Sequence, residues 1–271
     1  MDFPELALRY AEPFVLMLAR FGGLCAFAPV LSTSVIPAKA KALLVAMFAV
    51  GALPMVALTP PLHPAPDLAL LAVGMALEAL IGVTIGLLAT LPLYAAQLAG
   101  HVIDHQMGIG LAASYNPLLE TEGGVTGDLL MYIALAAFLT VGGLDAMYLG
   151  VLLSFEIVPL GNLDALASPL PLLISLVTAG FELALRLAAP VLCMIIVELV
   201  SSAFVMKTMP QINIMSIGFP IKIIIGLIAM VISVRAMGGA ITSFTADGID
   251  ATLHWVESLD RPTHAATTQT P

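Results

Sequence analysis

Three side chains within one short stretch have the types and the spacing of a metal site: His101, Asp104 and His105. On a helix, positions i and i+4 lie on one face, so the two imidazoles could share a zinc ion. A hydrolytic zinc site also needs a third protein ligand and a general base, and the other acids of the chain stand alone. We therefore favour a polar helix end, and we predict no catalytic, metal-binding or cofactor-binding residue.

Charged residues inside long apolar runs are the second feature that could take part in chemistry. A charge at membrane depth costs about 3 kcal/mol on insertion scales and normally faces protein, a partner charge or water. Two of these residues are four apart, so we expect mutual neutralisation, with a role in a polar path as the alternative. The other four lack a local partner, and they pair with each other or face another subunit. The set is Arg20, Glu78, Glu182, Arg186, Glu198 and Lys222, of which Glu182 and Arg186 form the local pair.

The composition of the chain indicates what surrounds it. Of its 271 residues, 60% are hydrophobic and 10% are charged, and the mean hydropathy is +1.06. A water-soluble domain carries about 25% charged residues, so most of this surface faces lipid or other apolar protein. The net charge of −9 gives no electrostatic reason to bind nucleic acid. The class expected is an all-α integral membrane protein.

Long apolar runs, broken by proline and glycine, define the expected helices. A straight crossing takes roughly 20 apolar residues, and the longer runs suggest kinks, for example at Pro92. After residue 244, acids alternate with apolar residues, which predicts a short amphipathic helix and then a disordered tail over 245–271. The runs are Pro13–Leu31, Ala42–Leu58, Leu68 to about Leu98, Leu129–Leu144, Ala146–Leu160, Leu172–Val205 and Ile212–Phe244.

Three segments resemble one family closely. They are ARFGGLCAFAPVLSTSVIPAKAKALL (Ala19–Leu44), QLAGHVIDHQMGIGLAASYNP (Gln97–Pro117) and MPQINIMSIGFPIKI (Met209–Ile223). Together they are similar to FliR, the flagellar export-gate family, whose injectisome counterpart is SctT. The resemblance runs from about Pro13 to Phe244. The residues that carry its hairpin motif are Pro210, Gln211, Asn213, Gly218, Phe219 and Pro220.

The resemblance implies a fold and an assembly. Residues 1–244 would form an export-gate membrane domain of kinked helical hairpins, FliP-like over about 13–160 and FliQ-like over about 172–244. One copy would join FliP-like and FliQ-like subunits in a helical hetero-oligomeric export gate, in contact with FlhB-like and FlhA-like export components and with membrane lipid. The gate would pass unfolded export substrates across the bacterial inner membrane at the flagellar basal body.

The resemblance also implies a plug. The glycine-rich stretch between about residues 108 and 124 maps to the family's channel plug, and small side chains with glycine hinges suit a segment that packs in one state and withdraws in another. A re-entrant loop is the alternative, and the acids Glu120 and Glu122 leave its gating details open. The plug residues expected are Met107, Gly108, Gly110, Asn116, Pro117, Gly123 and Gly124.

Three other functions compete with a flagellar gate subunit. An SctT-like injectisome subunit is the nearest, and the flagellar branch is favoured by Gly218–Pro220 followed by Lys222. A stand-alone secondary transporter would share the broken helices and buried charges, but the two halves show no internal repeat. An intramembrane metalloprotease rests only on His101, Asp104 and His105.

Overall fold

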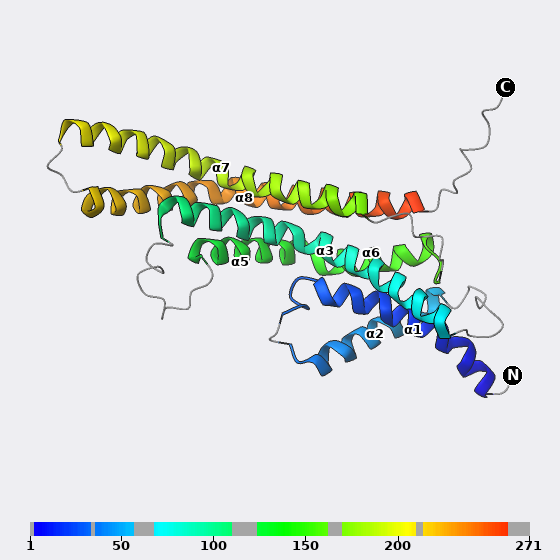
Figure 1. Cartoon of the computed structure of the whole chain (residues 1–271). Helices are drawn as coiled ribbons and strands as arrows, with labels where there is room; N and C mark the ends of the chain where they lie inside the picture. The colour runs from blue at the N-terminus through cyan, green and yellow to red at the C-terminus, as the bar shows by residue number, and fades with distance from the viewer. Residues whose placement is uncertain are drawn as a thin grey trace, which may run out of the picture. The chain divides into compact units, whose positions relative to one another are not determined.

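Helices account for all the regular structure in the described part of the chain. The computed structural model describes residues 3–33, 36–56, 68–109, 124–161, 170–209 and 214–259. The all-α prediction is confirmed for these residues (Figure 1). The helices are α1 (Phe3–Phe27), α2 (Ala38–Val56), α3 (Leu68–Met107), α5 (Val125–Thr140), α6 (Gly143–Ile157), α7 (Leu170–Thr208) and α8 (Ile214–Leu259).

Two helices extend further than their apolar runs. The sequence predicts a first helix from Pro13, whereas α1 begins at Phe3 and includes that proline. It also predicts a separate short helix after Phe244, whereas α8 continues without a break to Leu259. Apolar residues recur at helical spacing through Ile249, Leu253 and Val256, so the same helix carries on beyond the uninterrupted apolar run.

The end of α3 corrects one predicted site residue. Met107 was expected in the loop, but it is the last residue of α3 and its side chain is fully buried. Ile103, four residues earlier, is also fully buried. These two positions lie on one helical face, so packing extends the helix through the polar residues between them. The loop therefore begins at Gly108.

Two of the described helices are long and apolar enough to cross a membrane: α3, and residues Ile174–Thr208 of α7. Their mean hydropathies are 2.2 and 2.3. The number rises to four if two bent helix pairs each count as one span, and one of these pairs is α5 with α6. Large apolar side chains also lie on the surface of this chain, including Phe204, which is 68% exposed, and Val231, which is 70% exposed. Such a surface suits lipid or apolar partner protein rather than water.

The described residues form two compact units. The first contains α1, α2, α3 up to Thr90, α6 and the end of α8 from Asp247, and the second contains α3 from Leu91, α5, α7 from Leu176 and α8 up to Ala246. The predicted division into a FliP-like part and a FliQ-like hairpin near Gly161 stays a prediction.

Close backbone approach organises the first unit. A side chain at Gly82 of α3 would collide with the backbone carbonyl of Arg20 in α1, and a Cβ at Gly86 would lie 2.8 Å from the carbonyl oxygen of Leu24. Glycine is therefore required where α1 crosses α3. Beside this crossing four rings pack together, with centroids 5.0–6.0 Å apart: Phe21, Phe48, Tyr148 and Phe155.

Glycines also permit close packing in the second unit. α7 and α8 lie side by side as a long hairpin (Figure 1). A Cβ at Gly226 of α8 would lie 2.7 Å from Cγ of Met107, so the end of α3 packs against α8 at that glycine. The first turn of α5 meets α3 where Gly100 and Gly127 face each other. The last residues of α3 are thus held between α5 and α8.

Candidate functional site

The two ends of the predicted plug segment lie in the described part of the chain. α3 closes at Gly108, whose φ of +79° is in the left-handed region that favours glycine. The backbone N–H groups of Gly108 and Ile109 donate to the carbonyl oxygen of Asp104, over 2.9 and 3.1 Å. At the other end Gly124 is the N-cap of α5, with extended backbone. The remaining predicted plug residues, Gly110, Asn116, Pro117 and Gly123, lie outside the described residues.

Asp104 contacts the second end through its side chain. Its Oδ2 accepts hydrogen bonds from the backbone N–H groups of Thr126, over 3.1 Å, and Gly127, over 3.4 Å. These donors belong to the first turn of α5, whose N–H groups have no intrahelical partner. Gly124, having no side chain, cannot supply the usual capping oxygen. Asp104 supplies it from a different helix.

Metal binding has no geometric support around Asp104. The described part of the chain contains no group of three or more histidine, cysteine, aspartate or glutamate side chains that could hold a metal ion. His101 packs against α5, where a Cβ at Gly124 or at Gly127 would lie 3.0 Å from its Nδ1. His105 is exposed. The carboxylate between the two histidines is used as a helix cap.

Two of the charges that lacked a local partner, Arg20 and Glu78, form a buried ion pair. Arg20 of α1 donates from Nε to Oε2 of Glu78 in α3. Its other two nitrogens donate to Ser154 Oγ in α6, over 2.8 Å, and to the carbonyl oxygen of Val158, over 3.2 Å. The guanidinium carbon also lies 4.2 Å from the ring centre of Phe155. Of the two alternatives for these charges, pairing with each other is the one observed.

The other four charges have different environments. Glu182 and Arg186 approach to 2.6 Å on the surface of α7, as their spacing predicted, with side chains 61% and 71% exposed. Lys222 is half-buried in α8 and has no ion pair within the described residues. Glu198 is buried and accepts a hydrogen bond from Ser202 Oγ over 2.5 Å.

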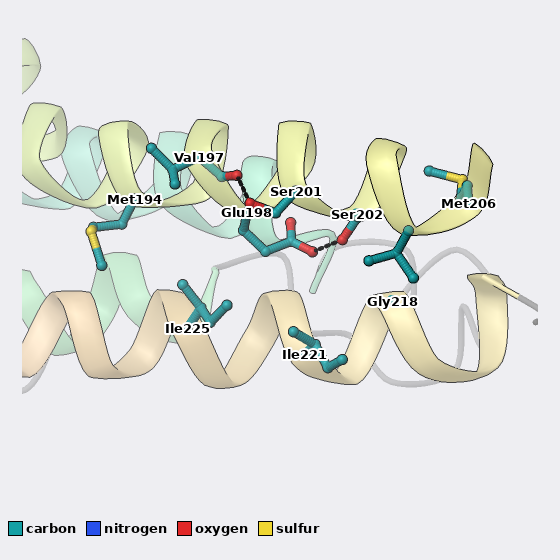
Figure 2. Close-up of a pocket in the computed structure, with 10 residues that line it drawn as sticks. Met194, Val197, Glu198, Ser201, Ser202, Met206, Gly218, Ile221 and Ile225 are labelled. Atoms are coloured by element: carbon teal, nitrogen blue, oxygen red, sulfur yellow. Dashed lines mark hydrogen bonds between the residues drawn. The ribbon is translucent and has the colours of Figure 1, made fainter. Parts of the chain in front are cut away.

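Glu198 faces a cavity of about 360 Å³ between α7 and α8. Figure 2 shows Glu198 and Ser202 on α7 pointing toward α8, opposite Ile221 and Ile225. Apolar atoms make up most of the lining. Of the hairpin-motif residues, Gly218 lines this cavity and Pro220 lies exposed on α8. Phe219 belongs to α8, and Pro210, Gln211 and Asn213 lie outside the described residues.

Sequence reasoning missed the partners of these side chains. Ser154, Val158 and Phe155 had no signal that linked them to Arg20, because the contacts join residues more than a hundred positions apart. The capping role of Asp104 was missed for a related reason, since its partners begin a helix on the far side of the loop. Only the i, i+4 pair on α7 had a local signal.

The helices and their buried charges define a class, an all-α protein with helices able to cross a membrane. Residues 11–247 match the family model described as "Bacterial export proteins, family 1", and the chain belongs to this family. The family prediction is confirmed. Family membership and the apolar helices place the chain in the bacterial inner membrane.

Relatives come from both branches that the sequence suggested. The chain is 28% identical over 235 residues to "Flagellar biosynthetic protein FliR" of Pectobacterium carotovorum, covering 84% of this chain and 85% of that one. It is 27% identical over 162 residues to the Bacillus subtilis protein of the same name, 57% of this chain and 61% of the relative. It is 26% identical over 157 residues to "Yop proteins translocation protein T" of Yersinia pestis, 57% of this chain and 60% of the relative.

Proposed function

We propose that this chain is a structural and gating subunit of the flagellar type III protein-export channel. The observation that carries the proposal is the family match over residues 11–247. One relative named for flagellar biosynthesis matches 84% of the chain, whereas the relative named for Yop translocation matches 57%, as does the Bacillus subtilis flagellar relative. An SctT-like role in an injectisome is the second candidate, and the Yersinia relative supports it.

The proposed assembly contains FliP-like and FliQ-like subunits, with FlhA-like and FlhB-like components alongside. Support comes from the exposed apolar surface of the α7–α8 hairpin, where Ile196, Phe204 and Ile232 are each more than half exposed. Exposed hydrophobic side chains in such numbers indicate a surface that contacts other protein or lipid rather than water. Partner helices and lipid together would cover this surface. Unfolded export substrates would pass through the channel that the subunits enclose.

The proposed plug is the segment from Gly108 to Gly124. Deleting it should make the inner membrane leaky to small ions, because nothing would then fill the channel between export events. Truncation after Leu259 is a suitable control, since it removes polar chain outside the proposed plug. A deletion that assembles normally and leaves ion permeability unchanged would contradict the plug.

Secretion in the source bacterium tests the flagellar assignment. Deleting the gene should abolish export of flagellar filament subunits and swimming, and a plasmid copy of this chain should restore both. If flagellar export continues while an injectisome stops secreting its substrates, the chain is the SctT-like subunit. A deletion that affects neither system would contradict an export role altogether.

A further inference from the structure

Glu198 is a buried acid without a counter-charge in the part of the chain that the structure describes. It is 6% exposed, and the hydrogen bond from Ser202 Oγ, over 2.5 Å, is the one bond to its carboxylate among the described residues. Lys222 of α8 forms no ion pair with it. An ionised carboxylate has about four acceptor positions, and taking its charge out of water is costly unless the charge is paired. Glu198 therefore needs a positive partner that the described residues do not supply.

The cavity beside this carboxylate has the size and the lining of a small-molecule site. Its volume is about 360 Å³, within the range of roughly 300–1,000 Å³ that ligand pockets occupy. Figure 2 shows the side chain of Glu198 pointing from α7 toward α8. Apolar atoms make up most of the wall, and its two methionines have flexible side chains that adapt to different ligand shapes. The apolar side chains that line the cavity are Met194, Val197, Val205, Met206, Ile221 and Ile225.

The chemistry of the cavity limits the class of ligand that it can hold. An anion would be repelled by the charge of Glu198. Mg²⁺ and Ca²⁺ take about six to eight oxygen ligands, whereas the polar side chains among the described lining residues are Glu198, Ser201 and Ser202. A neutral apolar molecule would fill the walls but leave the carboxylate unpaired. An organic ammonium with an apolar body satisfies both features, because its N–H groups donate to the carboxylate and its carbon atoms contact the walls.

We propose that the cavity between α7 and α8 binds a small organic amine in its protonated form, with the ammonium at Glu198 and the apolar body against the walls. This site goes beyond the export function proposed above and does not depend on it. An amine-bearing lipid suits the site less well, since the phosphate of a phosphatidylethanolamine head group lies close to its ammonium and would meet the same carboxylate. The ligand expected is therefore a free amine rather than a lipid.

Two probes of the same shape test the site: phenethylamine, which is a cation at neutral pH, and phenethyl alcohol, which is neutral. Each is titrated by calorimetry into the chain, purified in mild detergent with the subunits that accompany it, and into empty micelles as a blank. We expect saturable binding of the amine and binding of the alcohol that is weaker by about tenfold or more, because charge-assisted hydrogen bonds are stronger than neutral ones. Glu198→Gln should weaken amine binding by about tenfold or more and leave alcohol binding unchanged. Glu182→Gln is the matched control, an acid of the same helix whose side chain is 61% exposed, and its amine affinity should equal that of the unmodified protein.

Equal affinity for the two probes, or an amine affinity that Glu198→Gln leaves unchanged, would overturn the proposal. So would the absence of saturable amine binding, which is the result expected if a basic side chain of a partner subunit already covers the carboxylate. If Glu198→Gln fails to assemble, Ile225→Trp decides, because Ile225 points toward α7 (Figure 2) and a larger side chain there fills the cavity while the carboxylate stays in place. Amine binding should then be lost, and unchanged binding would also overturn the proposal. The readout is affinity, so failure of the site leaves the export assignment intact, and loss of the export assignment leaves the site intact.

Discussion

Arg20 of α1 and Glu78 of α3 form an ion pair of 2.5 Å, with side chains 0% and 3% exposed. The second carboxylate oxygen of Glu78 accepts the backbone N–H of Gly161 over 3.0 Å. The pair therefore joins α1 and α3 to the chain that follows α6. Each charge has its opposite and further hydrogen bonds, the condition under which a buried pair is tolerated.

Removing one member of this pair should destabilise the protein strongly. Glu78→Ala leaves the guanidinium of Arg20 buried without its counter-charge, at a cost of about 3–5 kcal/mol. We expect a lower thermal unfolding midpoint in detergent. The double variant Arg20→Met with Glu78→Leu should recover most of the loss, because apolar residues of similar volume need no partner.

The exposed pair on α7 is the matched control for that experiment. Glu182→Ala breaks an ion pair whose members are more than 60% exposed, and surface pairs contribute roughly 0–1 kcal/mol. Its midpoint in the isolated chain should stay close to that of the unmodified protein. If Glu78→Ala and Glu182→Ala lower the thermal unfolding midpoint equally, burial does not explain the contribution of the Arg20–Glu78 pair to stability.

Two adjacent glycines of α1 should respond to substitution in opposite directions. A Cβ at Gly23 would lie 3.0 Å from backbone atoms of Ala79 and Val83 in α3, whereas one at Gly22 meets nothing within 4 Å. Gly23→Ala should cost about 1–3 kcal/mol by forcing the helices apart. Gly22→Ala should gain up to about 1 kcal/mol through helix propensity. Thermal unfolding of both variants measures the difference, and a midpoint for Gly23→Ala at or above that of Gly22→Ala would refute the close crossing.

The two histidines beside Asp104 should be dispensable for export. Replacing His101 and His105 by alanine leaves the capping carboxylate in place and removes the imidazoles that a metal would need. Secretion of flagellar subunits should remain intact, and elemental analysis of the purified complex should give the same metal content before and after. Loss of export together with loss of a bound metal would revive the metal-site alternative.

Local patterns in the sequence predicted the helices, but they did not predict all of the helix ends. Apolar runs predicted helical segments because burial in lipid or protein selects the same residues. Met107 was placed in the loop because it follows the polar residues His101, Asp104 and His105 and precedes a glycine-rich stretch, whereas Ile103 and Met107 are buried and extend the helix. Burial of one helical face extends α3 to Met107. The composition of this stretch does not show that, because it averages over all faces of the helix.

The candidate site depended on contacts that no local pattern encodes. Glu182 and Arg186 could be paired from their spacing, since a helix brings i and i+4 together. Arg20 and Glu78 are 58 positions apart, and the sequence left open whether they meet each other or another subunit. The contact of Asp104 with Thr126 spans 22 positions across a glycine-rich segment. Only the folded arrangement of α3 and α5 brings them together.

The mass of the purified complex tests the gate assignment most directly. The chain should be co-expressed with FliP-like and FliQ-like subunits of its own bacterium, extracted in mild detergent, purified through a tag on this chain and weighed by native mass spectrometry. We predict one particle that contains all three proteins, with a single copy of this chain. A monodisperse monomer that binds neither partner would contradict the account.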